Sequence, residues 1–285
     1  MSLHFYKMTG SGNDFVFVDG RDEPGEQWSP ERIRALCDRR RGIGADGLVV
    51  LAPEGADARM VYFNADGSRG AMCGNAALCS ARLAARLGLA QESGMLLHTD
   101  AGIMKTRCVG PGWAAELLLP DFPLPAPVSL PLGSGERWMD LSTVGVPHLV
   151  ILVDEIASVD VVGRGRALRE DPAFAPAGLN VNFLGSLAGG ADPRWVMRTY
   201  ERGVEAETLA CGTGTVASAF ALARRGLDRV PIRIRSWGGN VFSVAGRLEP
   251  VVGGVEPGWA REPWLCGEGR LVFEGLLAGT PDLPF

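Results

Sequence analysis

Two segments of the 285-residue chain repeat each other, and this repeat narrows the possible folds more than any other feature. Each is an alanine-rich run that begins with Cys-Gly, at Cys73 and at Cys211, and is followed at the same distance by Gly88 or Gly226. Glycine just past the last turn commonly ends an α-helix, so both runs are predicted to be helices. A short apolar run with strand character precedes each of them.

The duplication predicts two domains of similar structure, each with strands wrapped around one central buried helix. Both helices are nearly free of acidic residues and apolar on most of their surface, as expected of helices enclosed by other elements. The first half is predicted to comprise residues 1–121, completed by 271–285, and the second half residues 122–270. The proline-rich stretch 120–131 is the expected linker. The fold class is therefore α/β (α+β), with two pseudo-symmetric domains.

Composition limits the functional classes. Apolar residues make up 46% and charged residues 21% of the chain, which is typical of a folded globular protein. The net charge of −5 and the lack of long basic runs argue against nucleic acid or a charged membrane surface as partner. The N-terminus has no signal-peptide pattern, and no apolar run is long enough to span a membrane, so we expect a cytoplasmic protein.

A cysteine at the start of a helix has unusual chemistry. The unpaired N–H groups and the helix dipole favour the thiolate, so the pKa of Cys73 or Cys211 is expected to fall towards neutrality. The same N–H groups form a site for an anion such as a carboxylate. The residues that supply them are Gly74, Asn75, Gly212 and Thr213.

Two such helix starts facing one carboxylate would suit inversion at the α-carbon of an amino acid. One thiolate would remove the proton from one face, and the other thiol would supply a proton to the opposite face. Neither step needs a cofactor, and only Lys7 and Lys105 could hold pyridoxal phosphate. No metal site is expected, because no cysteine pair has C-x-x-C spacing and the chain has three histidines. The remaining cysteines are expected to be inert thiols: Cys37, Cys79, Cys108 and Cys266.

Seven motifs follow one another along nearly the whole chain: Lys7–Phe15, Gly42–Gly47, Phe63–Gly67, Met72–Ala76, Asn180–Phe183, Tyr200–Gly203 and Glu207–Gly214. In this order they resemble the diaminopimelate epimerase family. The resemblance implies two α/β domains with the active site between them, and Cys73 and Cys211 as the acid–base pair. It also implies that His148 and Glu201 tune the thiols.

The resemblance further implies the activity. The family interconverts LL- and meso-diaminopimelate without a cofactor, in lysine and peptidoglycan precursor biosynthesis. A small amino-acid substrate is thus the expected partner; a homodimer is compatible with the sequence, which leaves the oligomeric state open. Substrate contacts are expected from Asn13, Asn64, Gly74, Asn75, Asn180, Glu201, Arg202, Gly212 and Thr213.

Three positions depart from the family pattern. Gly47 stands where members often have glutamine, Val146 where they often have asparagine, and Phe273 where many have a tyrosine for dimer contact. The first two positions are expected near the far end of the substrate. Because buried charges at that end need polar partners, its recognition is the least determined part of the site.

Other functions remain open at this stage. A racemase of proline, hydroxyproline or histidine could share this fold, although Asn75 favours the diaminopimelate branch. A cysteine hydrolase using His148 would leave the second cysteine motif unexplained, and a binding module would not need two thiols. The stretch Gly42–Gly47 fits the G-x-G-x-x-G pattern of dinucleotide binders, but a helix precedes it and a strand follows, the reverse of the required order.

Overall fold

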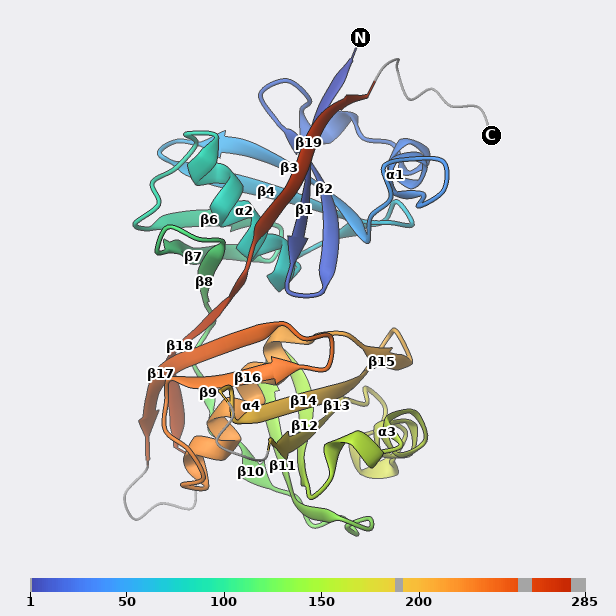
Figure 1. Cartoon of the computed structure of the whole chain (residues 1–285), viewed down its shortest axis with the longest axis vertical. Helices are drawn as coiled ribbons and strands as arrows, with labels where there is room; N and C mark the ends of the chain where they lie inside the picture. The colour runs from blue at the N-terminus through green and yellow to red at the C-terminus, as the bar shows by residue number, and fades with distance from the viewer. Residues whose placement is uncertain (1, 188–191, 251–257, 278–285) are drawn as a thin grey trace. The chain divides into compact units, whose positions relative to one another are not determined.

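The computed structural model describes residues 2–187, 192–250 and 258–277 (Figure 1). The described residues divide into two compact units. The first unit contains residues 2–117 and 266–277, and the second contains residues 118–187, 192–250 and 258–265. The chain therefore enters the second unit once and returns to the first near its C-terminus.

The first unit combines a sheet with two α-helices. Its elements are β1 (Leu3–Gly10), β2 (Asn13–Asp19), η1 (Gly25–Gln27), α1 (Pro30–Cys37), β3 (Gly47–Glu54), β4 (Asp57–Asn64), β5 (Arg69–Gly70), α2 (Gly74–Arg86), β6 (Met95–Thr99), β7 (Gly102–Val109), β8 (Ala114–Leu118) and β19 (Arg270–Leu277).

The second unit likewise combines a sheet with two α-helices. They are β9 (Phe122–Pro123), β10 (Ala126–Pro127), β11 (Glu136–Val144), β12 (Val146–Val153), η2 (Ile156–Ser158), α3 (Val161–Arg169), η3 (Pro172–Phe174), β13 (Asn180–Ser186), β14 (Trp195–Glu201), β15 (Ala206–Thr208), α4 (Gly212–Arg224), β16 (Ile232–Ser236), β17 (Val241–Glu249) and β18 (Trp259–Glu268), whose last residues belong to the first unit.

Strand pairing repeats between the units. In the first unit β1–β2 is antiparallel, β2–β3 parallel, β3–β4 antiparallel, β4–β6 parallel and β6–β7 antiparallel. In the second unit β11–β12, β12–β13, β13–β14, β14–β16 and β16–β17 follow the same sequence of directions. In both units the central helix lies, along the chain, between the two strands of the second parallel pair: α2 between β4 and β6, and α4 between β14 and β16. The predicted α/β fold class is confirmed.

The two central helices have matching ends. Cys73 is the N-cap of α2 and Cys211 the N-cap of α4, both with φ −138°. Gly88 and Gly226, which follow the last turns, both have φ +68°, a left-handed conformation that glycine adopts without strain. Each helix is surrounded by strands of its own unit (Figure 1), and almost every residue of its middle turns is buried.

A second, shorter helix completes the core of each unit. Ser29 caps α1 by accepting a hydrogen bond from the Arg32 N–H, with Pro30 as first helical residue. Ile33 and Leu36 of α1 pack on β2 and β3 in one apolar cluster, while Val161 and Leu168 of α3 pack in the corresponding cluster of the second unit. Burial of these faces holds both helices on their sheets.

The proline-rich stretch differs from the expected linker. Part of it forms β9 and β10, which pair with β18 and β11 through Phe122 opposite Ala260 and Ala126 opposite Leu141. Proline has no N–H to donate, but short pairings of this kind need few donors. The stretch is therefore part of the second unit rather than a separate connection.

Candidate active site

The first group of predicted site residues lies around the start of α2. Cys73 is half-buried at the N-cap, and a side chain built at Gly74 would meet no atom within 4 Å. Asn75, in the first turn, is 7% exposed. The helix start thus presents backbone N–H groups next to a thiol with open space beside Gly74, which suits a small anion.

A chain of hydrogen bonds fixes the amides of Asn13 and Asn75. Asn75 Nδ2 donates to Asn13 Oδ1 over 2.7 Å, and Asn13 Nδ2 donates to Asp46 Oδ2 over 3.0 Å. Asp46 also pairs with Arg39, which holds Asp14 as well. Because an ionised carboxylate only accepts hydrogen bonds, Asp46 sets the orientation of Asn13, and Asn13 in turn sets that of Asn75.

Asn64 is fixed by a second chain of the same kind. Asp66 Oδ1 accepts from Ser68 Oγ over 2.6 Å, and Ser68 Oγ accepts from Asn64 Nδ2 over 3.0 Å. Asn64 Oδ1 then accepts from the Tyr62 hydroxyl over 2.8 Å. The carboxylate again determines every direction in the chain. The second N–H of the Asn64 amide has no acceptor among the described residues and is available to a ligand.

Tyr62 holds the predicted site residue Asn64 in place, and the sequence analysis gave it no role. Its ring lies between two glycines on neighbouring strands: a Cβ at Gly47 would be 2.7 Å, and one at Gly70 2.6 Å, from ring carbons of Tyr62. Gly47 therefore leaves room for the Tyr62 ring, whose hydroxyl holds Asn64. The sequence contains one indication, a glycine at position 47 where family members often have glutamine. Only the strand pairing shows that the Tyr62 ring occupies the space beside this glycine.

The second group lies around the start of α4, where the expectation for Cys211 was wrong. The Cys211 side chain is buried, and burial together with the nearby Glu201 carboxylate raises its pKa to about 11. The Gly214 N–H and the Thr213 hydroxyl, whose Oγ1 lies 3.8 Å from the sulfur, oppose this without overcoming it. Burial also raises the pKa of Glu201. Loss of hydration outweighs the helix dipole, so Cys211 is a thiol at neutral pH.

Asn182 links this helix start to His148. A Cβ at Gly214 would lie 2.2 Å from Asn182 Oδ1 and 3.2 Å from Cys211 Sγ, so only glycine leaves room for the amide there. Asn182 Nδ2 lies 3.2 Å from His148 Nδ1. The sequence analysis quoted Asn182 within a motif but gave it no role. His148 is placed against Asn182, and burial with the charge of Arg202 lowers its pKa to about 3.

Asn180 and Arg202 come together at the edge of this group. The Arg202 backbone N–H donates to Asn180 Oδ1 over 2.8 Å. The guanidinium donates through Nη1 to the carbonyls of Ala177 and Gly178, over 3.3 and 3.5 Å. In the described part of the chain no carboxylate lies within ion-pair distance of this guanidinium. Arg202 is therefore held in place with a charge that an anionic ligand could neutralise.

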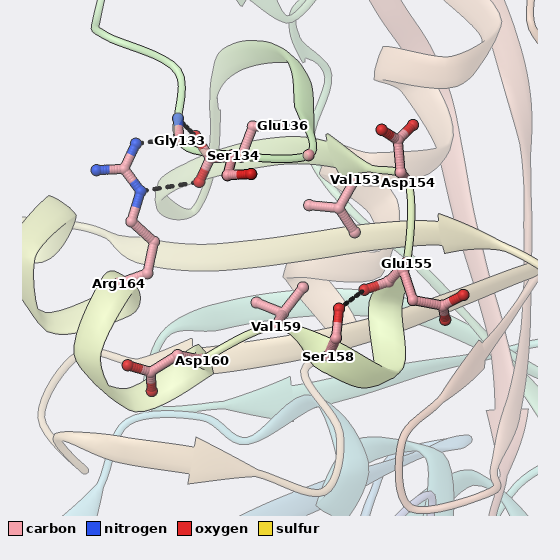
Figure 2. Close-up of a pocket in the computed structure, with 11 residues that line it drawn as sticks. Gly133, Ser134, Glu136, Val153, Asp154, Glu155, Ser158, Val159, Asp160 and Arg164 are labelled. Carbon is pink, nitrogen blue, oxygen red and sulfur yellow. Dashed lines mark hydrogen bonds and ion pairs between the residues drawn. The ribbon is translucent and has the colours of Figure 1, made fainter.

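A pocket of about 360 Å³ lies elsewhere, between the ends of β11 and β12 and the start of α3. In Figure 2 Arg164 pairs with Glu136, and the Ser158 hydroxyl donates to the backbone carbonyl of Glu155. None of the predicted site residues lines it. Within residues 2–187, 192–250 and 258–277, no group of three or more His, Cys, Asp or Glu side chains is arranged to hold a metal ion.

Comparison with known proteins decides the family. The family model of diaminopimelate epimerase matches residues 5–115 and 141–245. The chain belongs to the diaminopimelate epimerase family. A diaminopimelate epimerase from Gemmatimonas aurantiaca is 46% identical over 97% of this chain and 100% of its own length. One from Aquifex aeolicus is 34% identical over 97% of this chain and 98% of its own.

Solved structures show how widely the fold is shared. A phenazine biosynthesis protein of the PhzF family from Enterococcus faecalis superposes with a TM-score of 0.67 at 16% identity, covering 97% of this chain and 99% of its own. A hydroxyproline epimerase from Agrobacterium vitis gives 0.62 at 20% identity, covering 97% and 92%. At these identities the likeness extends to the fold alone.

Because the chain belongs to the diaminopimelate epimerase family, it is an isomerase. The alternative prediction of a cysteine hydrolase is therefore set aside. The described helices include none long and apolar enough to cross a membrane. The structure places the predicted residues in two groups, around Cys73 in the first unit and around Cys211 in the second.

The buried His148 predicts an acid-sensitive fold. Its pKa is about 3 in the folded protein against an ordinary 6.5, so the unfolded chain binds an additional proton between these values. The stability that depends on the neutral imidazole is full above pH 6.5 and is lost as the pH falls towards 3, by about 5 kcal/mol in all. Urea unfolding midpoints at pH 7, 5.5 and 4 measure the loss.

The control for this prediction is His148→Leu, which has no proton to bind. Its midpoint should fall less steeply between pH 7 and pH 4 than that of the wild type. Equal slopes for the two proteins would show that other groups cause the acid sensitivity and that His148 is not buried as a neutral ring.

Proposed function

We propose that the protein is a cofactor-independent diaminopimelate epimerase that interconverts the LL- and meso-isomers by two-base proton transfer between Cys73 and Cys211. The observation that carries this proposal is the duplicated helix start, with a cysteine as N-cap and glycine as first helical residue in both units. We further propose that the enzyme acts in the cytoplasm, in the supply of lysine and peptidoglycan precursors.

The helix starts would bind the carboxylate at the reacting carbon. Backbone N–H groups of Gly74 and Asn75 on one side, and of Gly212 and Thr213 on the other, can donate to its oxygens. When the α-proton leaves, negative charge passes from carbon to this carboxylate. Donors already fixed in place stabilise that charge more than they stabilise the substrate, which lowers the barrier.

The two thiols would act on opposite faces of the α-carbon. In one direction the thiolate of Cys73 takes the α-proton as the carbon–hydrogen bond breaks, and the Cys211 thiol gives its proton to the other face. The raised pKa of Cys211 supports its role as the proton donor in the resting enzyme. In the reverse direction the Cys211 thiolate takes the α-proton and the Cys73 thiol gives its proton to the other face. Glu201, whose pKa is raised by burial, is close enough to influence the Cys211 thiol.

The far end of the substrate would be bound by fixed polar groups. The spare N–H of Asn64 suits a carboxylate oxygen, because Tyr62 and Ser68 keep the amide oxygen turned away. Arg202 has a guanidinium without a carboxylate partner in the described residues, which suits the same group. Tyr62 supplies, through Asn64, a polar contact in the region where Gly47 has no side chain.

The test is incubation with LL- and with meso-diaminopimelate in deuterium oxide. We expect interconversion in both directions, with solvent deuterium at the α-carbon of the product isomer. The protein should also be assayed with proline, hydroxyproline and histidine. Faster racemisation of one of these than of diaminopimelate would overturn the proposed substrate.

Removing the Tyr62 hydroxyl should weaken substrate binding. In Tyr62→Phe the Asn64 amide loses the donor that fixes its oxygen, so it can turn and present oxygen to the substrate carboxylate. One such hydrogen bond contributes about 1 kcal/mol, which predicts an increase in KM for diaminopimelate of about 5-fold with kcat little changed. Steady-state kinetics on both isomers provides the measurement.

Tyr200→Phe is the matched control, because Tyr200 is also buried and donates its hydroxyl to Glu205 over 3.2 Å, away from Asn64. Its KM should equal that of the wild type. An unchanged KM in Tyr62→Phe, or an equal increase in both variants, would rule out a specific role for the Tyr62 hydroxyl.

A further inference from the structure

A chain of buried polar groups runs from β14 through β13 to β12 in the second unit. The Thr199 hydroxyl donates to Asn182 Oδ1 over 3.0 Å. Asn182 Nδ2 is 3.3 Å from the carbonyl oxygen of Leu149 and 3.2 Å from His148 Nδ1. The Thr199, Asn182 and His148 side chains are at most 2% exposed, so water does not compete for these bonds.

The chain allows one arrangement of protons. A backbone carbonyl only accepts, so the nitrogen of the Asn182 amide must face Leu149, and the amide oxygen must face Thr199. The other hydrogen on that nitrogen points to His148 Nδ1, which must accept it. A neutral imidazole that accepts at Nδ1 carries its own proton on Nε2. Turning the amide over would set its oxygen against the Leu149 carbonyl.

The other ring nitrogen is buried without a partner. His148 Nε2 has no hydrogen-bond partner among the described residues, although it is shielded from solvent. A buried donor left unsatisfied costs about 1–3 kcal/mol, so such groups normally meet an acceptor in the working protein. The ring also stays neutral at physiological pH, because burial and the Arg202 charge both disfavour the imidazolium.

We propose that Asn182 is a positioning residue that locks His148 as the Nε2–H tautomer, so that His148 serves the reaction as a hydrogen-bond donor and not as a base. This inference rests on the proposed function for what the donor meets: an anionic acceptor, either a thiolate or the substrate carboxylate. His148 cannot take a proton from a thiol, because Nε2 already carries one and the lone pair on Nδ1 is used by Asn182. No proton moves on the ring during turnover.

Nitrogen NMR of the histidine rings tests the tautomer without substrate. The chain has three histidines, His4, His98 and His148, and the His148 signals are identified by their loss in His148→Gln. In the full-length protein labelled with ¹⁵N-histidine, we expect a proton-bearing Nε2 and a bare Nδ1 that do not change between pH 5 and pH 8. A proton on Nδ1, or titration in that range, would overturn the proposal.

Variants of Asn182 test whether this residue determines the tautomer of His148. In Asn182→Leu, which is similar in volume, the ring is no longer held and should show a shift towards the Nδ1–H form. Asn182→Asp provides a second variant if the first does not fold, since a carboxylate at this place accepts from Nδ1–H and should reverse the tautomer. An Nε2–H signature unchanged in a folded variant would show that Asn182 does not set it.

Kinetics separates a donor from a base. The amide N–H of a glutamine can replace Nε2–H but cannot act as a base, so we expect His148→Gln to keep kcat within about 10-fold of the wild type and His148→Leu to lose about 100-fold. Equal losses would show that His148 transfers a proton. The two proposals fail separately: a wild type inactive on diaminopimelate overturns the proposed function, whereas the NMR result depends on neither substrate nor turnover.

Discussion

Cys73→Ala and Cys211→Ala should each abolish the interconversion of LL- and meso-diaminopimelate, by about 10³-fold or more. General acid–base groups contribute about 10²–10⁴-fold each, and here a single thiol can serve only one face of the α-carbon. A variant without Cys73 has no base for one isomer, and a variant without Cys211 has no acid to complete the same inversion. The reverse direction must fail equally, because both directions pass through one transition state. Following α-proton exchange and isomer ratio together measures both effects.

Cys108→Ala is the matched control. Cys108 is a half-buried thiol on β7 that contacts the carbonyl of Ala81 and lies at no helix start. Its loss should leave kcat and KM unchanged. Full epimerisation in either Cys73→Ala or Cys211→Ala would refute two-base catalysis, and an equal loss in Cys108→Ala would indicate that activity reports only on folding.

The fold could be predicted from the sequence because its main signals are local. A cysteine and a glycine mark the start of each central helix, and Gly88 and Gly226 mark the ends. Strands such as β4 and β14 are β-branched or apolar runs bounded by turn residues. Since the second unit repeats the cysteine-glycine start and the glycine end, the prediction of each central helix was supported by a second occurrence of the same signals. The two strands in the proline-rich stretch, β9 and β10, could not be predicted, because a strand of two residues has no periodic pattern in the sequence.

The electrostatics of the site could not be predicted in the same way. The helix dipole contributes about 0.3–1 kcal/mol to a charge at its end, and up to about 2 kcal/mol when partly buried, whereas full burial can shift a pKa by about 3–5 units. Sequence shows that Cys211 starts a helix but not how deeply it is buried or that Glu201 is near. The same holds for Tyr62 and Asn182. Each is fixed by a glycine far from it in the sequence or on another element, and only the folded chain brings them together.

Arg202→Leu should reduce kcat/KM for diaminopimelate by about 10²–10³-fold, mainly through KM. The guanidinium is positioned by the carbonyls of Ala177 and Gly178 and has no carboxylate partner in the described residues. If it binds the distal carboxylate of the substrate, its removal leaves a desolvated anion with only neutral donors such as Asn64, and losing one member of such a charge pair costs about 2–5 kcal/mol. Steady-state kinetics on both isomers, with substrate raised until the rate saturates, distinguishes KM from kcat.

Two further variants show whether the loss belongs to binding at that carboxylate. Arg202→Lys keeps the charge but loses the two parallel hydrogen bonds of the guanidinium, so its KM should fall between those of the wild type and Arg202→Leu. Arg229→Leu removes an exposed guanidinium from the same unit and should change nothing. The rate at which iodoacetamide alkylates Cys211 should be the same in all three variants, because none of the substitutions alters the burial of that thiol. If Arg202→Leu slows kcat and thiol alkylation while KM stays constant, Arg202 acts on the thiol and not on the substrate, and the distal carboxylate must be recognised elsewhere.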